Sequence, residues 1–267
     1  MPTSIRHALN AARARIQPVS DSAGYDAQVL LGRVLGVDRV YLLAHPTDEL
    51  TDEQQEQFDE WVERCATGEP LAYIIGQRAF YDRDLFVSTA VLVPRPETEL
   101  LLEMALKFAH SHYGCTAVDV GTGSGALAVI FAAHQPASTV YATDVSPDAL
   151  EVAQYNAETQ HASVTFYRGD LLAPLLERGL QVDLIMANLP YIPSRVVDEL
   201  PVTRHEPRLA LDGGADGLDL VRRLLQQAQQ VILSGGLMLL EIGYDQGAAA
   251  AALAQSHFPT GGPCDRH

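Results

Sequence analysis

Basic residues are scarce in this 267-residue sequence, and lysine is almost absent. Lysine and arginine together number 18 against 34 aspartates and glutamates, and Lys107 is the only lysine, so the formal net charge at pH 7 is −16. A chain this acidic, with no dense cluster of basic side chains, repels a phosphate backbone. The composition therefore argues against nucleic acid as a direct substrate.

Long apolar runs and clustered metal ligands are also lacking. No stretch of 18 apolar residues is present, and the N-terminus shows no signal-peptide pattern, so we expect a cytoplasmic protein without a membrane span. The cysteines Cys65, Cys115 and Cys264 are far apart in the sequence, and the nine histidines show no ligand spacing. We therefore expect neither a disulfide framework nor a metal site.

Residues 1–70 carry the signals of a helical domain. Thr51-Asp52-Glu53-Gln54 has the form of a capping box, and an apolar stripe of helical period follows it. Residues 71–94 differ, because short β-type runs at Tyr73-Ile74-Ile75 and Leu85-Phe86-Val87 flank turn residues. We predict that this second stretch is a β-hairpin linker between the helical domain and the domain that follows.

Residues 95–267 alternate between apolar strands and helices and form the expected catalytic domain. The predicted strands are 117–120, 140–143, 164–167, 184–187 and 237–242, and the predicted helices between them are 125–134, 147–158, 171–178 and 217–233. Near-continuous apolar strands that alternate with helices are typical of a parallel sheet covered on both faces. The predicted fold class is therefore α/β with a Rossmann-like parallel sheet.

A glycine-rich loop directly follows the first of these strands. Its residues are Gly121, Thr122, Gly123, Ser124 and Gly125, and Asp144 ends the second strand. Glycines let the backbone approach a ligand closely, and a helix N-terminus supplies free N–H groups. A carboxylate at the end of the second strand can accept both hydroxyls of a ribose. The pattern predicts a nucleotide-like cofactor and fits both a nicotinamide dinucleotide and S-adenosylmethionine.

Asn188-Leu189-Pro190-Tyr191 follows the fourth strand, at the edge where ligands bind in open α/β sheets. The Asn188 side-chain oxygen and the Leu189 carbonyl can accept the two N–H bonds of an amide, which orients its nitrogen and offsets positive charge during methyl transfer. Pro190 favours an extended backbone at the preceding residue, and Tyr191 offers an aromatic wall. The tetrapeptide therefore predicts methylation of a planar nitrogen.

Four segments together resemble the glutamine N5-methyltransferases that act on peptide chain release factors. They are residues 68–76, 94–99, 188–191 and 206–214. The resemblance implies a small helical substrate-recognition domain before a class I methyltransferase domain, with S-adenosylmethionine as the cofactor. It implies that the substrate is the glutamine of a Gly-Gly-Gln tripeptide in a release factor, so that the reaction tunes translation termination.

The resemblance also assigns roles by position. It implies that residues 121–125 line the methyl donor, that Asp144 holds the donor's ribose and that Asp170 and Leu171 flank its adenine. Asn188 borders the donor and, with Leu189, Pro190 and Tyr191, holds the substrate amide. Leu189 departs from the family motif, which has proline at this position. The backbone before the Leu189 carbonyl is therefore freer than in the family. The family's two further strands have no counterpart after residue 257, and we expect a truncated or altered C-terminus.

Several other functions fit part of the pattern. The same chemistry can act on a glutamine of a ribosomal protein, or on adenine N6 or cytosine N4 in nucleic acid, although the acidic charge disfavours the latter two. A nicotinamide-dependent oxidoreductase has no use for Asn188, and a protein that binds S-adenosylmethionine without turnover is the non-enzymatic alternative. We expect a monomer that acts on a protein substrate, with no membrane partner.

Overall fold

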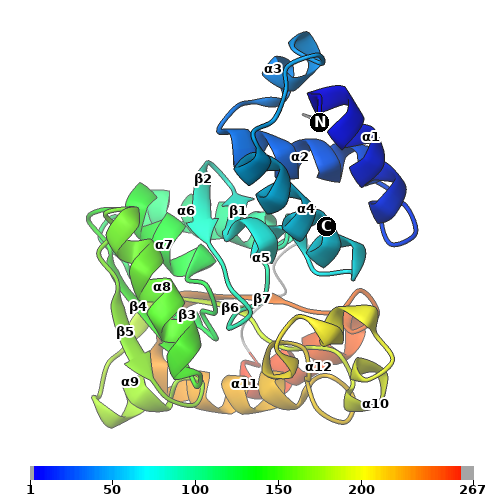
Figure 1. Ribbon diagram of the computed structural model, residues 1–267. Coiled ribbons are helices and arrows are strands. Elements are labelled where there is room, and N and C mark those ends of the chain that lie inside the picture. Colours follow the sequence, from blue (N-terminus) through cyan, green and yellow to red (C-terminus); the bar gives the residue numbers. More distant parts are fainter. Residues whose placement is uncertain (1–2, 260–267) are drawn as a thin grey trace. The chain divides into compact units, whose positions relative to one another are not determined.

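Helices dominate the N-terminal part of the chain in the computed structural model, which describes residues 3–259. The chain divides into two compact units, Met1–Gln77 and Arg78–His267, of which the first contains these helices (Figure 1). They are α1 (Ile5–Ile16), α2 (Ala23–Leu35), α3 (Arg39–Ala44), α4 (Asp52–Ala66) and α5 (Leu71–Ile75). The predicted capping box is present, since Thr51 and Gln54 hydrogen-bond each other's backbone N–H at 3.2 and 2.9 Å. The predicted helical N-terminal part is confirmed.

The predicted strand at Tyr73-Ile74-Ile75 is wrong, because these residues belong to helix α5. Pro70 precedes the helix, and Gly76 ends it in the left-handed conformation with a φ of 70°. Tyr73 and Ile74 are buried, so apolar burial rather than strand pairing explains this run. A short apolar run has no period that separates helix from strand. The two-stranded sheet lies further along, in β1 (Gln77–Phe80) and β2 (Arg83–Phe86).

A five-stranded parallel sheet organises the second unit, and its strands lie in the order β5-β4-β3-β6-β7. The strands are β3 (Thr116–Val120), β4 (Thr139–Asp144), β5 (Thr165–Arg168), β6 (Val182–Asn188) and β7 (Ile232–Glu241). The chain runs outward from β3 to β5 and then returns to add β6 on the other side of β3. The order thus reverses between β3 and β6, and ligands bind outside the carboxyl ends of the strands at such a point.

Helices cover both faces of this sheet (Figure 1). Those on one face are α6 (Thr98–Ser111), α7 (Ala126–His134) and α8 (Pro147–Thr159); those on the other are α9 (Ala173–Glu177) and α11 (Asp219–Val231), with α12 (Gly247–His257) packed on α11. The side chains of β3 alternate accordingly, since Ala117 packs in the core with α6 and α7, whereas Val118 and Val120 pack with α11. The predicted α/β fold is confirmed.

The connection between β6 and α11 contains only short helices. They are α10 (Ser194–Val197) and the 3-10 turns Pro201–Arg204 and Arg208–Ala210. Within residues 3–259, no helix is both long and apolar enough to cross a membrane. Most of the C-terminal stretch for which we expected a truncated or altered end, residues 260–267, lies outside the described residues.

Candidate active site

A cavity of about 300 Å³ opens at the carboxyl ends of the parallel strands. Ten of the twelve residues that the sequence assigned to the site line it: Gly121, Thr122, Gly123, Ser124, Asp144, Asp170, Leu171, Asn188, Leu189 and Pro190. The other two, Gly125 and Tyr191, lie outside the lining. Fold topology therefore brings together segments that are up to 69 residues apart in the sequence, from Gly121 to Pro190.

The glycines of the loop have two different surroundings. A Cβ added at Gly123, which lines the cavity, would meet no protein atom within 4 Å, so the space beside this residue is open. A Cβ at Gly125 would lie 3.0 Å from Val129 and 3.1 Å from Ala153. Gly125 thus permits the close packing of α7 and α8, whereas Gly123 leaves room for a ligand at the backbone.

Asp144 holds the loop in place. Its two carboxylate oxygens accept hydrogen bonds from the backbone N–H groups of Gly123 and Ser146, both at 2.9 Å. Burial raises the pKa of Asp144, and these N–H groups oppose that rise. Because each carboxylate oxygen can accept more than one hydrogen bond, the side chain keeps acceptor capacity for hydroxyls in the cavity.

Asp170 and Leu171 lie at the next strand end along the sheet edge. Asp170 forms an ion pair with Arg223 of α11, and both side chains line the cavity. Leu171 is buried and adopts a φ of 52°, a left-handed conformation that is unusual for a branched side chain. Such backbone strain occurs mainly where the surrounding structure holds a functional loop in one shape.

Asp119, which the sequence reasoning missed, lies beneath the glycine-rich loop. It is 1% exposed and accepts hydrogen bonds from the Thr122 hydroxyl at 2.6 Å and from the Ala128 N–H at 3.2 Å. Burial raises its pKa to about 6, even though both hydrogen bonds favour the charged form. The sequence signal for this residue was a single acid in the otherwise apolar end of β3, two residues before Gly121.

The buried carboxyl of Asp119 predicts a pH-dependent stability. An aspartate of ordinary pKa 3.8 that titrates near 6 when folded binds more protons in the folded state, so its stabilising effect is lost as the pH rises from about 4 to above 6. The loss amounts to about 3 kcal/mol at most. We expect the free energy of unfolding of Asp119→Asn, relative to the unsubstituted protein, to increase between pH 4 and pH 7. Urea titrations at both pH values measure this, and a pH-independent difference would contradict it.

Asn188, at the end of β6, is held by residues from two other elements. Its side-chain N–H donates to the Thr98 hydroxyl at 2.9 Å, and that hydroxyl donates to Glu241 Oε2 at 2.7 Å. Glu241 ends β7 directly opposite Asn188 in the sheet. Burial raises the pKa of Glu241, and the side chains of Thr98 and Asn188 oppose the rise.

An ion pair joins two of the segments that carried the resemblance. Both Glu206 oxygens accept from Arg95, at 2.8 and 2.7 Å, and the Glu206 side chain is only 1% exposed. Arg95 and Pro207 line the cavity, so this pair fixes the segment around residue 206 beside it. Both contacts come from the same guanidinium nitrogen, Nη2, and a charge-assisted pair of this kind is stronger than a neutral hydrogen bond.

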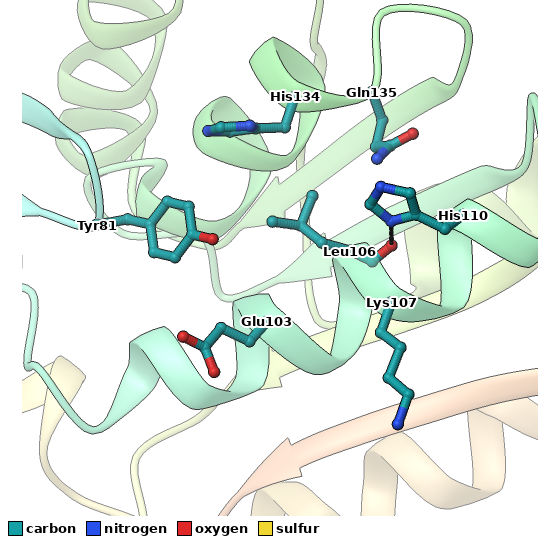
Figure 2. A pocket seen from close by; sticks show the side chains of 7 residues that line it. All are labelled: Tyr81, Glu103, Leu106, Lys107, His110, His134 and Gln135. Atoms are coloured by element: carbon teal, nitrogen blue, oxygen red, sulfur yellow. Dashed lines mark hydrogen bonds between the residues drawn. The ribbon is translucent and has the colours of Figure 1, made fainter.

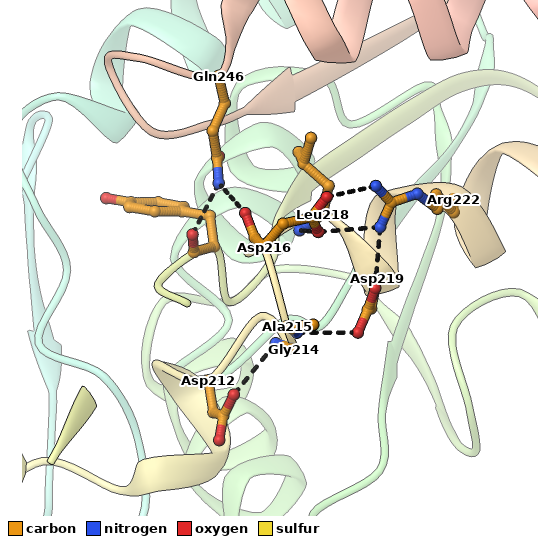
Figure 3. A network of polar contacts seen from close by, with 9 residues as sticks. Asp212, Gly214, Ala215, Asp216, Leu218, Asp219, Arg222 and Gln246 are labelled. Atoms are coloured by element: carbon orange, nitrogen blue, oxygen red, sulfur yellow. Dashed lines mark hydrogen bonds and ion pairs between the residues drawn. The ribbon is translucent and has the colours of Figure 1, made fainter. Parts of the chain in front are cut away.

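The backbone around Tyr191 is fixed by a second polar network, shown in Figure 3. The Gln246 side chain donates to the carbonyl oxygens of Tyr191 at 2.9 Å and Asp216 at 3.3 Å, and its own oxygen accepts from the Gly243 N–H at 2.8 Å. All the polar atoms of this buried side chain are therefore used. Tyr191 itself is half-buried, and burial raises the pKa of its phenol.

A second cavity, of about 440 Å³, lies between α6 and α7 and has a different character (Figure 2). It contains no glycine-rich loop and none of the predicted site residues. His134 is paired with Asp82 at 3.2 Å, and the Nδ1 atom of His110 lies 2.6 Å from the Leu106 carbonyl oxygen. Within the described part of the chain, no group of three or more potential ligands is arranged to hold a metal ion. The cavity at the strand ends is thus the candidate site.

Comparison with known proteins agrees with this arrangement. A model of the PrmC N-terminal domain matches residues 7–76, and a model of the methyltransferase small domain matches residues 96–203. The release factor glutamine methyltransferase of Moorella thermoacetica is 46% identical over 234 residues, which cover 86% of this chain and 82% of the relative. The chain belongs to the release factor glutamine methyltransferase family. The predicted family is confirmed.

Two further matches differ in similarity. The release factor glutamine methyltransferase of Coxiella burnetii is 39% identical over 255 residues, which cover 95% of this chain and 91% of that relative. A solved structure, the T. thermophilus 16S rRNA N2 G1207 methyltransferase in complex with AdoMet and guanosine, is 16% identical, with a TM-score of 0.49 over 68% of this chain and 44% of the other. Family membership thus rests on sequence similarity along most of the chain.

Proposed function

We propose that the protein transfers a methyl group from S-adenosylmethionine to the side-chain amide nitrogen (N5) of a glutamine in a peptide chain release factor. The observation that carries the proposal is the side chain of Asn188, which lines the cavity at the strand ends while its N–H group donates to the Thr98 hydroxyl. The names of the relatives in the family support the choice of substrate.

The residues around the cavity fit S-adenosylmethionine. Gly123 leaves open space beside its backbone, and Asp144 keeps acceptor capacity for the ribose hydroxyls. Asp170 and Leu171 stand at the neighbouring strand end, where they would border the adenine. When bound, this cofactor supplies an electrophilic methyl group on a positively charged sulfur. Three aspartates, Asp119, Asp144 and Asp170, line the cavity against two arginines, Arg95 and Arg223, and this small excess of acid suits a cationic ligand.

The tetrapeptide would hold the substrate amide. The Asn188 oxygen and the Leu189 carbonyl would accept its two N–H bonds, which orients the nitrogen and stabilises the positive charge that develops on it. Pro190 restricts the backbone of Leu189, and Tyr191 would lie against the planar amide. No strong general base is required, because the methylated amide releases its extra proton readily to water.

The two units would divide the work. We place recognition of the release factor on the helical part, residues 1–70, and chemistry on residues 95–267, with residues 71–94 as the linker. We further propose that the protein works in the cytoplasm, because its substrate acts in translation, and that it works as a monomer. The family relatives, which are named for the same substrate class, support the release factor as the partner.

A methyl-transfer assay tests the proposal. Purified protein is incubated with methyl-labelled S-adenosylmethionine and a release factor, either unsubstituted or with Gln→Ala in its Gly-Gly-Gln tripeptide. We expect label on the unsubstituted factor alone, and mass spectrometry should place it on that glutamine. Equal label on both factors would overturn the assigned glutamine. Cofactor binding without label on either would overturn the release factor as the substrate.

A further inference from the structure

We infer that Thr98 and Glu241 are positioning residues that fix the side-chain amide of Asn188 with its oxygen facing the substrate. The inference rests on the proposed function, since it concerns the group that would hold the substrate amide. Neither residue belongs to the glycine-rich loop or to the tetrapeptide. Thr98 begins α6, within the segment 94–99, and Glu241 ends β7.

The reason lies in the shape of an asparagine side chain. Its oxygen and its NH2 group occupy nearly the same space, so rotation by half a turn exchanges an acceptor for two donors. Only the orientation with the oxygen toward the cavity can accept an N–H bond from a substrate amide. A free Asn188 side chain would therefore spend part of its time in an unproductive orientation.

Thr98 and Glu241 remove that ambiguity. A threonine hydroxyl has one proton, and Thr98 donates it to Glu241 Oε2 at 2.7 Å, so toward Asn188 it can only accept. The Glu241 carboxylate is also an acceptor; it lies opposite Asn188 in the sheet register, and the Asn188 side chain favours its charged form. Both neighbours thus require the NH2 group of Asn188, and the oxygen is left for the cavity.

Burial makes this preference strong. Thr98 is 5% exposed, and Glu241 is partly shielded, so water does not replace a lost hydrogen bond freely. If the Asn188 amide were reversed, its oxygen would face the acceptor lone pairs of Thr98 and Glu241, with no donor between them. An unsatisfied polar contact of this kind is disfavoured in a shielded site. The β6–β7 register contributes as well, because it sets Glu241 directly opposite Asn188.

The central test compares Thr98→Val with Thr98→Ser. Valine keeps the shape of threonine and removes the hydroxyl, whereas serine keeps the hydroxyl. We expect Thr98→Val to lower kcat by about 10- to 100-fold, less than the loss of a direct contact, with the Kd for S-adenosylmethionine unchanged. Thr98→Ser should restore kcat to within a few-fold. Thr139→Val, an exposed site at the amino end of β4, is the matched control.

A second readout does not depend on the reaction. In 15N-labelled protein, the side-chain N–H protons of Asn188 should exchange slowly with water, and Thr98→Val should speed up their exchange. Glu241→Gln, which offers a donor as well as an acceptor, should also speed it up and lower kcat. Equal kcat losses in Thr98→Val and Thr98→Ser, or unchanged exchange in Thr98→Val, would overturn the inference. Slow exchange that depends on Thr98, in a protein that methylates no release factor, would overturn the proposed function and leave the positioning intact.

Discussion

Asn188→Ala is expected to lower the single-turnover rate of methyl transfer by about 10²–10³-fold, the usual loss when a preorganised polar contact to the transition state is removed. The side chain lines the cavity, and its orientation is fixed by Thr98 and Glu241. Without it, the substrate amide keeps only the Leu189 carbonyl as an acceptor. The experiment uses saturating S-adenosylmethionine and release factor, so that the rate reports the chemical step.

The same variant should bind S-adenosylmethionine almost as tightly as the unsubstituted protein, because the contacts expected of the loop and Asp144 are untouched. Gln230→Ala, an exposed position on α11, is the control for a polar truncation elsewhere. A rate unchanged by Asn188→Ala would remove Asn188 from the mechanism. A large loss of cofactor affinity would instead assign Asn188 to the donor side of the cavity.

Periodicity and strand-end motifs predicted the sheet because they are local properties of the chain. The apolar runs of β3 and β6 and the helix start at Ser146-Pro147 appear where expected, and the Ser146 hydroxyl accepts from the Ala149 N–H at 3.2 Å. The strand predicted at residues 73–75 was wrong because a run of three apolar residues before a glycine is too short to show a helical or strand period. Local signals thus determine most elements but leave short apolar runs ambiguous.

The support of the site could not be predicted in the same way. Thr98 and Glu241 are in hydrogen-bond contact although 143 residues separate them, and neither occurs in a spacing that marks a partner. Gln246 likewise contacts the Tyr191 carbonyl from 55 residues away. Such pairs come together only when the strands have assembled in their final order. The sequence therefore predicts the loop and the tetrapeptide but not the residues that orient them.

The structure also gives Leu189 a role that its sequence context did not suggest. Its side chain is 5% exposed and packs in the core with Val118 and Val120. A Cβ added at Gly121 would lie only 2.9 Å from it, so the loop passes directly against this leucine. The family motif has a proline at this position, whose ring restricts the backbone. In this chain, burial of the Leu189 side chain restricts the backbone instead, and its contact with Gly121 holds the glycine-rich loop against the tetrapeptide.

Gly217→Ala is expected to lower kcat by about 10²-fold, because it displaces the backbone of the tetrapeptide. A Cβ at this position would lie 2.1 Å from the Tyr191 carbonyl oxygen and 2.4 Å from the Gln246 side-chain nitrogen. These two atoms form the hydrogen bond between Gln246 and Tyr191, the last residue of the tetrapeptide. Both atoms must therefore move away from the new methyl group at position 217. A displacement of about 1 Å near reacting groups can cost this much in rate.

Gly235→Ala provides the matched control for backbone strain. Gly235 has a φ of 82°, against 80° for Gly217, but a Cβ there would meet nothing within 4 Å. Both substitutions therefore carry the same left-handed strain, about 1–2 kcal/mol, and only Gly217→Ala adds the collision with Tyr191. We expect thermal unfolding to shift for both variants and kcat at saturating substrates to fall for Gly217→Ala alone. Equal kcat losses in the two variants would mean that strain, and not the position of Tyr191, limits the rate.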